Sequence, residues 1–260
     1  MKLHDFVGAP NPKKVRVYLA EKGITIPVQP VNIVTGENRT PEFLKRNPLG
    51  GLPVLELDDG TFLPESLAII EYFEELHPDP PMIGTTPLDR ARVRALERVA
   101  ELGVLNSIAT IFQNSHPFMA GRLKQSADTA ENARARLGVN LKALDDAIGK
   151  RPFVAGTRPT IADCTLLAAL GFGEFAGVPL DPAFKNVGRW YDAFRARERE
   201  RFERLFPRHR TVVLERAGHY IQEDAPEDFI AAIEAWDDED RAPVAPAGRP
   251  DVGAPGGGHA

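Results

Sequence analysis

The chain has 260 residues, of which 43% are apolar and 27% are charged, a composition typical of a folded protein with room for one large or two small domains. Its 32 basic and 37 acidic residues give a net charge of −5, so we expect no nucleic-acid partner. No run reaches the roughly 18 apolar residues that a membrane span needs, and the start lacks the apolar core of a signal peptide. We therefore expect a cytoplasmic protein without a membrane partner.

The cysteine and histidine content limits the chemistry further. The single cysteine, Cys164, excludes an internal disulfide and a Cys-x-x-Cys redox pair. Six scattered histidines without close pairing provide no zinc spacing, so no metal site is expected. Thiol chemistry in this protein would therefore use a thiol that a ligand brings.

Short β-rich runs alternate with helical patterns over residues 1–76, which predicts a small α/β domain. The pair Asp59-Gly60 favours the positive φ of a tight hairpin between the last two strands. The expected strands are 2–6, 26–34, 52–57 and 61–63, and the expected helices are 12–22, 41–46 and 66–76.

Four prolines and Gly84 interrupt residues 77–87, so this segment is the expected domain linker. From 88 to 205 the apolar pattern is helical, which predicts an all-helical second domain. Its longest helix, 88–114, should border a cleft between the domains. The clearest repeat, at i, i+4, i+7 and i+11, is Leu137, Leu141, Leu144 and Ile148.

The pattern changes after residue 205. Residues 211–215 are strand-like, and 226–236 form an amphipathic helical pattern. The last twenty residues, 241–260, are rich in Pro, Gly and Ala and have almost nothing to bury, which predicts disorder. We expect an extra β-α segment over 206–240, followed by a disordered tail.

Asn11 and Pro12 form a compact helix-start signal, with Asn11 as N-cap and Pro12 at the first helical position. The amides and the dipole at such a helix end favour a thiolate over a thiol, and Lys13 and Lys14 add positive potential. The alternative is that Asn11 only caps the helix, and residue type alone favours the cap.

Two dipeptides further along the domain suggest a peptide-like ligand. Leu52-Pro53 stands at the start of an expected strand; if its peptide bond is cis, the main chain of Leu52 can pair with an extended peptide, whereas a trans edge proline is the alternative. Glu65-Ser66 opens the next helix and can hold an α-carboxylate and its ammonium neighbour, although such a pair alone is more often only a helix start. The three signals together suit the thiol, cysteinyl and γ-glutamyl parts of glutathione.

The run NPLGGLPVLELDDGTFLPESLAIIEY, residues 47–72, resembles the glutathione-site segment of cytosolic glutathione transferases. The resemblance extends over about residues 1–200 and implies a thioredoxin-like α/β domain followed by an all-α domain, with glutathione as co-substrate and a homodimer as the assembly. The residues that it places against glutathione, apart from the sulfur, are Asn38, Leu52, Pro53, Glu65 and Ser66.

The loop Gly8-Ala9-Pro10-Asn11-Pro12 resembles the Thr-Pro-Asn-Gly loop of nu-class-like bacterial members, in which an asparagine faces the sulfur. The resemblance implies that Asn11 is the catalytic residue and that Ala9 lies beside the thiol. His4 and Ala9 leave the usual Tyr or Ser hydroxyl unavailable, and Tyr18 lies nearly two turns into the helix. Thiol activation would then depend on amides, on the helix dipole and on Asn11.

In the helical half, the resemblance implies an electrophile pocket walled by Phe112 and His116, with Asn114 and Phe118 as further candidates. For each of these, packing in the core or a place on a loop surface is the alternative. Thr160-Ile-Ala-Asp163 resembles the capping box of the family, which makes Asp163 a folding residue rather than a catalytic one.

Residues 210–229 resemble the last strand, histidine loop and final helix of α/β-hydrolases, most closely those of haloalkane dehalogenases. His219 corresponds to their catalytic histidine, but the chain contains no nucleophile elbow of the form GxSxG. We therefore expect His219 to have no catalytic partner, and the following helix to lie on the helical domain or to pair with another chain.

The sequence thus predicts a glutathione transferase that conjugates the glutathione thiolate to small hydrophobic electrophiles. Two alternatives share the fold. One is a glutathione-dependent disulfide reductase, which the nu-like loop suggests. The other is a non-catalytic interaction module.

Overall fold

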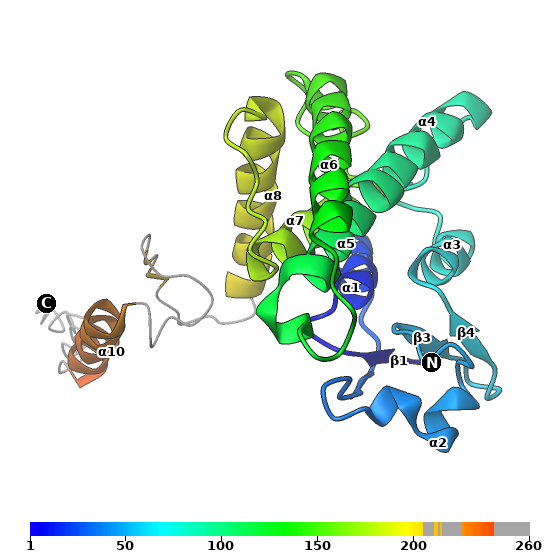
Figure 1. Cartoon of the computed structure of the whole chain (residues 1–260), viewed down its shortest axis with the longest axis horizontal. Coiled ribbons are helices and arrows are strands. Elements are labelled where there is room, and N and C mark those ends of the chain that lie inside the picture. Colours follow the sequence, from blue (N-terminus) through cyan, green and yellow to red (C-terminus); the bar gives the residue numbers. More distant parts are fainter. Residues whose placement is uncertain (205–210, 213, 215–224, 242–260) are drawn as a thin grey trace, which may run out of the picture. The chain divides into compact units, whose positions relative to one another are not determined.

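The computed structural model describes residues 1–204, 211–212, 214 and 225–241, which belong to two units, Met1–Phe202 and Glu203–Ala260. The first unit contains an α/β half and a helical half (Figure 1). None of the helices in the described ranges is long and apolar enough to cross a membrane.

A four-stranded sheet organises the α/β half. Its strands are β1 (Lys2–Asp5), β2 (Val28–Pro30), β3 (Val54–Glu56) and β4 (Phe62–Pro64), in the order β2-β1-β3-β4. β1 is parallel to β2 and antiparallel to β3, and β3 is antiparallel to β4. The hairpin between β3 and β4 has Gly60 at φ 85°, as the Asp-Gly signal predicts.

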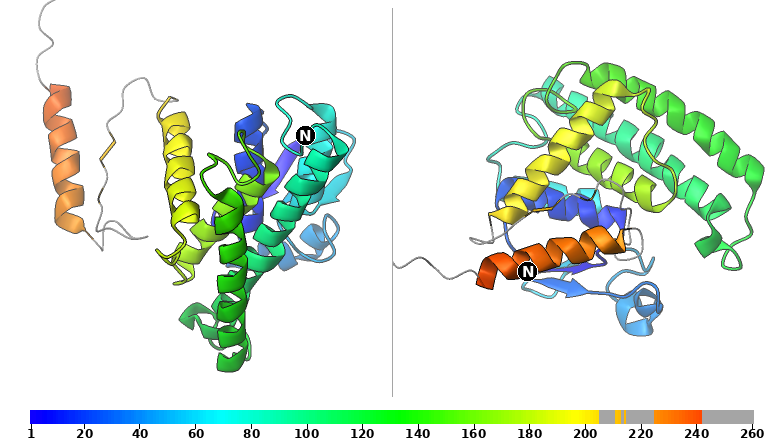
Figure 2. Two further views of the ribbon diagram at one scale, coloured as in Figure 1. Left: turned by 90° about the horizontal axis from the view of Figure 1, so that it is seen from above. Right: turned by 90° about the vertical axis from the view of Figure 1, so that its left-hand side faces the viewer.

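Alternating side chains give this sheet two covered faces. Leu3 and Leu55 belong to the larger core cluster, with α1 (Pro10–Lys22) and α3 (Ser66–Leu76). Val54 packs instead with Phe43 of α2 (Pro41–Leu44) on the opposite face. Figures 1 and 2 show α1 and α3 on one side of the sheet and α2 on the other. This is the thioredoxin-like arrangement that the sequence predicts.

The second strand is much shorter than the predicted range 26–34. Pro30 has no amide to donate to a neighbouring strand. Two residues later the side chain of Asn32 accepts hydrogen bonds from the amides of Val34 and Thr35, at 2.9 and 3.3 Å. This turn around Asn32 replaces the ladder, so the prediction of a strand to residue 34 was wrong.

The predicted long helix is one continuous rod with an irregular centre. It consists of α4 (Pro87–Arg98), the π-helical segment η2 (Val99–Leu105) and α5 (Asn106–Ser115), and the backbone stays helical at both junctions. The other helices of this half are α6 (Ala127–Ile148), α7 (Ile161–Phe175) and α8 (Lys185–Glu203). Single 3-10 turns, η1 (Glu37–Arg39) and η3 (Pro117–Met119), complete the first unit.

The helix α7 is the centre of the helical half. Eleven of its fifteen residues are buried, as expected for a helix that is surrounded by others. It packs against α1, α4 and η2, so it joins the helical half to the α/β half (Figure 2). The predicted apolar stripe of α6 is confirmed, because Leu137, Leu141, Leu144 and Ile148 are all buried.

The capping box at the start of α7 is also confirmed. The Asp163 carboxylate accepts hydrogen bonds from the amides of Thr160 and Val154, both at 2.8 Å, and from the indole of Trp190 at 2.8 Å. Burial raises the pKa of Asp163 to about 6, against the lowering effect of these hydrogen bonds. Asp163 is therefore a folding residue.

The second unit contributes α10 (Pro226–Arg241), which confirms the predicted helix at 226–236 and extends it. Its apolar residues Ile230, Ile233 and Trp236 are exposed. Thr211, Val212 and Leu214 are not in a strand, contrary to prediction. His219, for which we predict no catalytic partner, lies outside the described residues, as do residues 242–260 of the predicted disordered tail. Arg241, the first residue of that predicted tail, is instead the last residue of α10.

Candidate functional site

The amino end of α1 is the first part of the candidate site. The helix begins at Pro10, Ala9 is the N-cap in an extended conformation, and Asn11 is the exposed second residue of the helix. The prediction that Asn11 is the N-cap was therefore wrong. Pro10 rather than Pro12 occupies the first position, since either proline has the fixed φ and the missing amide that suit it.

Two prolines leave this helix end with few hydrogen-bond donors. Pro10 and Pro12 have no amide hydrogen, and the amide of Lys13 donates to the carbonyl of Ala9 at 3.2 Å. Asn11 is thus the one residue among the first three of α1 whose amide can reach a ligand. An anion bound there would depend on the backbone and the side chain of the same residue.

Lys14 does not add positive potential to this helix end, contrary to prediction. Its ammonium is buried, with 1% of the side chain exposed, and pairs with Glu101 of η2 at 2.7 Å. The pairing neutralises the charge that the sequence assigned to the thiol site. Lys13 remains half-buried beside α7, and a Cβ atom added to Gly171 would lie 3.1 Å from its Nζ.

The loop between β1 and α1 is braced by Arg16, a residue that sequence reasoning missed. Its Nη2 donates to the carbonyl of Val7 at 2.8 Å, and its Nη1 donates to the carboxylate of Asp5. Asp5 is only 2% exposed, so the pair is fixed at the end of β1. An aspartate at the end of a buried strand, eleven residues before an arginine on the next helix, was the available signal.

Tyr18 and His4 lie close in sequence to the amino end of α1, but the structure uses both side chains in the fold. Tyr18 is fully buried and donates to Glu74 at 2.7 Å, and burial raises the pKa of its phenol. His4 is 1% exposed and bonded to Glu56 at 2.8 Å, and burial lowers the pKa of its imidazole. The Tyr18 hydroxyl is used by Glu74, and the Nδ1 atom of His4, which has no hydrogen-bond partner, is buried, so neither side chain offers an accessible polar group to a thiol.

Leu52 presents its main chain beside the sheet. The Leu52-Pro53 bond is cis, and β3 begins only at Val54. Within the described ranges, neither the amide nor the carbonyl of Leu52 has a hydrogen-bond partner. The loop before it is held by Asn47, whose side-chain amide donates to the carbonyl of Gly51 at 2.9 Å. An extended peptide could therefore pair with Leu52 as an added strand.

The start of α3 has an unusual backbone. Glu65 lies at φ 73° and ψ 118°, the only positive φ of a non-glycine residue in the part of the chain that the structure describes. Such a conformation persists only where the surroundings enforce it, typically at a ligand clamp. Ser66 is buried, and the first helical hydrogen bond runs from the Ile69 amide to the Glu65 carbonyl at 3.0 Å. The preceding amides of α3 are consequently open to an anion.

The side chain of Asn38 uses one of its hydrogen-bonding groups within the fold. Its side-chain amide donates to the carbonyl of Gly50 at 2.7 Å. Gly50 lies at φ 64°, and a Cβ there would be 2.7 Å from the Asn38 carbonyl, so this position requires glycine. Asn38 retains a second amide hydrogen and its carbonyl oxygen for a ligand.

The predicted electrophile residues are part of an aromatic cluster at the carboxyl end of α5. The ring of Phe112 lies 4.7 Å from that of His116 and 6.3 Å from that of Phe118. Phe172 and Phe175 of α7 join them, with ring centroids 5.3 and 5.7 Å from Phe112. The structure therefore brings Phe112, His116 and Phe118 together.

The members of this cluster differ in exposure. Phe112 is 8% exposed, whereas Phe118 is 43% exposed and lies under the guanidinium of Arg122 at 4.1 Å. The fourth candidate, Asn114, is used in the fold: its side-chain Oδ1 accepts from the amide of Ser126 at 3.2 Å. Two of the five rings, Phe172 and Phe175, belong to α7, the helix that also packs against α1.

Other reactive groups are scarce. Cys164 is fully buried, and burial raises its pKa well above the usual value, so it is not a nucleophile. Among the described residues, no group of three or more His, Cys, Asp and Glu side chains could hold a metal ion.

The main chain of Leu52 offers an open edge to a peptide, and the starts of α1 and α3 can each bind an anion. These are the features of a thioredoxin-like protein that binds a thiol peptide. Two family profiles support a specific assignment: the N-terminal domain of glutathione S-transferase matches residues 3–81 and its C-terminal domain matches residues 107–198. The chain belongs to the glutathione S-transferase family.

Individual relatives agree. Glutathione S-transferase 2 of Saccharomyces cerevisiae is 32% identical over 201 residues, which cover 76% of this chain and 86% of that protein. A maleylacetoacetate isomerase of Pseudomonas aeruginosa is 34% identical, with 72% and 89% covered. The crystal structure of a glutathione S-transferase domain-containing protein from Marinobacter aquaeolei VT8 has a TM-score of 0.71 at 34% identity, with 76% and 98% covered. Gtt2 from Saccharomyces cerevisiae also has a TM-score of 0.71, at 31% identity, with 79% and 100% covered.

The prediction of a glutathione transferase with glutathione as its co-substrate is confirmed by these matches. The roles of individual residues and the electrophilic substrate stay predictions.

Proposed function

We propose that this enzyme conjugates the glutathione thiolate to small hydrophobic electrophiles that bind against Phe112 and His116. In this proposal, the thiolate lies at the amino end of α1 and the γ-glutamyl group at the start of α3, while the cysteinyl unit pairs with Leu52. The residues proposed to contact glutathione are Ala9, Asn11, Asn38, Leu52, Pro53, Glu65 and Ser66.

The single observation that carries the proposal is the start of α3. A positive φ at a residue such as Glu65 costs on the order of 1–3 kcal/mol. Here it precedes the buried Ser66 and the open amides of α3. The conformation has no evident use for packing, because Glu65 itself is exposed. It would place a carboxylate beside an anion site, as a zwitterionic γ-glutamyl group requires.

At the other end, thiol activation would depend mainly on Asn11. One net hydrogen bond to a charged group contributes roughly 1.5–3 kcal/mol, which lowers a thiol pKa by about one to two units. Starting from about 8.5, that leaves much of the thiol ionised at neutral pH. Activation without a hydroxyl group is therefore feasible at a helix end that has few amides.

The proposal is tested by titrating the protein with glutathione and following the ultraviolet absorbance of the thiolate. Ser66→Ala should weaken binding by about 1–3 kcal/mol through lost anion contacts, whereas Ser66→Thr, which keeps the hydroxyl, should bind more tightly than the alanine variant. Asn11→Ala should chiefly raise the pKa of the bound thiol. Unchanged affinity in Ser66→Ala would remove the clamp, and an unchanged thiol pKa would remove Asn11 from the site.

Two other reactions are separated by parallel assays. A glutathione-dependent disulfide reductase would reduce a mixed disulfide faster than it conjugates a chlorinated aromatic. The similarity to a maleylacetoacetate isomerase supports a second candidate, a glutathione-dependent cis–trans isomerisation. Conjugation faster than both would favour the main proposal, whereas glutathione binding without any turnover would favour a non-catalytic module.

We also propose a cytoplasmic homodimer, which analytical ultracentrifugation and cell fractionation would test. For the carboxyl-terminal segment, we propose no hydrolase role, since His219 has no nucleophile elbow to serve. Release of halide from a haloalkane in the absence of glutathione would contradict this.

A further inference from the structure

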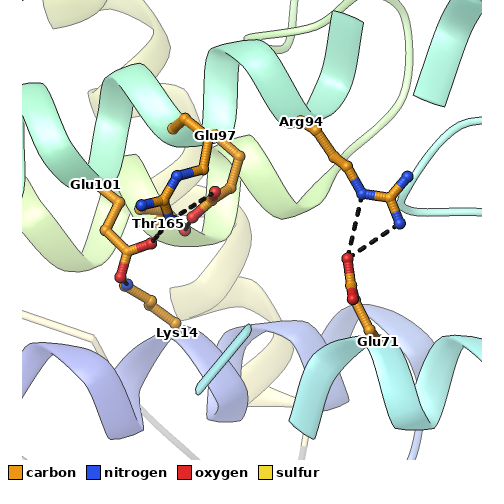
Figure 3. Close-up of polar contacts among 7 residues, drawn as sticks. Lys14, Glu71, Arg94, Glu97, Glu101 and Thr165 are labelled. Carbon is orange, nitrogen blue, oxygen red and sulfur yellow. Dashed lines mark hydrogen bonds and ion pairs between the residues drawn. The ribbon is translucent and has the colours of Figure 1, made fainter. Parts of the chain in front are cut away.

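Two ion pairs connect the α/β half to the rod formed by α4 and η2, and Figure 3 shows both. Lys14 of α1 donates to Glu101 of η2 at 2.7 Å, and Arg94 of α4 donates to Glu71 of α3 at 3.0 Å. Their surroundings differ. Lys14 is 1% exposed and Glu101 20%, whereas Arg94 and Glu71 are 44% and 42% exposed.

This difference in burial decides what each pair can do. An exposed pair is screened by water and holds its helices weakly, so Arg94 and Glu71 can separate at little cost. A buried ammonium cannot separate from its carboxylate without becoming an unpaired charge in the interior. α1 and η2 each pack on α7, and the buried Lys14–Glu101 pair joins these two elements to each other in one arrangement.

Two carboxylates, those of Glu97 and Glu101, lie near Lys14, and below neutral pH one of them is charged. Glu97, at the end of α4, is 1% exposed, and its Oε1 accepts from Thr165 of α7 at 3.0 Å (Figure 3). Its Oε2 has no hydrogen bond but lies 3.8 Å from the guanidinium of Arg98. Burial and the charge of Glu101 raise the pKa of Glu97 to about 7, against the opposing effects of Lys14, Thr165 and Arg98. Glu101 behaves differently: although burial acts to raise its pKa, Lys14 and Arg98 hold it below the usual value. Below neutral pH, Glu101 is thus the anion that binds Lys14.

Lys14 lies where a small displacement matters. It is the fifth residue of α1, about 6 Å along the helix axis from Pro10, where the proposed thiolate site begins. Its partner Glu101 lies in the rod that continues into α5, which carries Phe112 at its carboxyl end. The ion pair therefore links the helix that holds the sulfur to the helix that walls the electrophile pocket.

We propose that Lys14 is a positioning residue that, through its buried contact with Glu101, fixes the thiolate end of α1 relative to the electrophile pocket. This inference rests on the proposed function. Neither Lys14 nor Glu101 touches substrate in this account. They set the approach of sulfur to electrophile, a distance for which an error of about 1 Å can cost on the order of a hundredfold in rate.

The test compares two net-neutral double variants, one directed at each of the two ion pairs. Lys14→Met with Glu101→Gln removes the buried pair and also the ion pair of Glu101 with Arg98, and Arg94→Met with Glu71→Gln removes the exposed pair as a control. Each variant is assayed for the dissociation constant of glutathione, the pKa of the bound thiol, and kcat and KM with a chlorinated aromatic electrophile.

We expect the Lys14 variant to bind glutathione within about twofold of the parent, because Leu52, Glu65 and Ser66 belong to the α/β half. Its kcat/KM for the electrophile should fall by about 10- to 100-fold. The Arg94 variant should match the parent in every measurement. An unchanged kcat/KM in a folded Lys14 variant would overturn the proposal, and so would an equal loss of glutathione affinity and turnover, which a merely structural role produces.

Glu101→Asp keeps both charges and serves if the double variant does not fold. It shortens the carboxylate arm by one methylene, and should lower kcat/KM for the electrophile by about tenfold while leaving glutathione affinity unchanged. Full activity in Glu101→Asp would overturn the proposal. Failure of the parent protein itself to bind glutathione would instead remove the proposed function, so the two failures are distinguishable.

Discussion

Glu97 is buried beside Glu101, which predicts that the stability of the protein depends on pH in a defined direction. Its pKa is about 7 in the folded chain and 4.5 in the unfolded chain. The folded state therefore holds a proton between these values that the unfolded state has released, so stability is full below pH 4.5 and falls as the pH rises towards 7. From the difference between the two pKa values, the loss amounts to about 3 kcal/mol above neutral pH.

Glu97→Gln tests this reasoning, because glutamine resembles the protonated side chain. Its carbonyl can still accept from Thr165, and its amide, like a protonated carboxyl, carries no charge beside Glu101. Urea denaturation should show little difference from the parent at pH 5. At pH 8 the variant should be more stable by about 3 kcal/mol, as an order-of-magnitude figure.

The exposed Glu75 offers a matched control. Glu75→Gln changes the net charge of the chain by the same amount as Glu97→Gln, but it removes the carboxylate from a solvated position. That variant should keep the pH dependence of the parent. The parent and Glu97→Gln share Asp163, whose raised pKa adds a similar trend to both, so the difference between them isolates Glu97. Parallel stability curves for parent and Glu97→Gln from pH 5 to pH 8 would refute the reasoning.

Three further substitutions probe the fold and the site. Asp163→Ala should cost about 3–5 kcal/mol in urea denaturation, because it leaves buried donors such as the Trp190 indole unpaired; a loss below about 1 kcal/mol would show that water replaces the carboxylate. Arg16→Met should weaken glutathione binding by about tenfold, since the brace on Val7 is lost, and unchanged binding would mean that the loop is held by other contacts. Phe118→Ala should raise the KM for a chlorinated aromatic by about threefold to tenfold without changing glutathione affinity, and an unchanged KM would place Phe118 outside the pocket.

Features that depend on residues adjacent in sequence were predictable. The start of α3 at Ser66, the hairpin at Gly60 and the capping box of α7 each follow from the chemistry of a few adjacent side chains. The apolar stripe of α6 follows from the helical period alone. The long helix was also predictable, although its π-helical centre was not, because no local residue pattern requires the wider turn.

Errors arose where two equivalent local signals compete. Pro10 and Pro12 can each begin a helix, and the asparagine between them looks like a cap for the second proline. The structure uses the first proline, so Asn11 moves inside the helix and becomes the only amide donor among its first three residues. The error changes the chemistry, because a helix end with a single free amide gives Asn11 a larger share of any thiolate stabilisation.

The Lys14 cluster was out of reach for a different reason. Lys13-Lys14 has the pattern of a solvated pair near a helix end, and Glu97 and Glu101 have that of a charged helix face. Lys14 and Glu101 are 87 residues apart, and they are neighbours because α1 and η2 both pack on α7. A buried ion pair is weak evidence for stability, because apolar residues of similar volume often replace it without loss. An apolar pair has no preferred direction of contact, whereas the hydrogen bond from the Lys14 ammonium to the Glu101 carboxylate joins α1 and η2, which both pack on α7, in one arrangement.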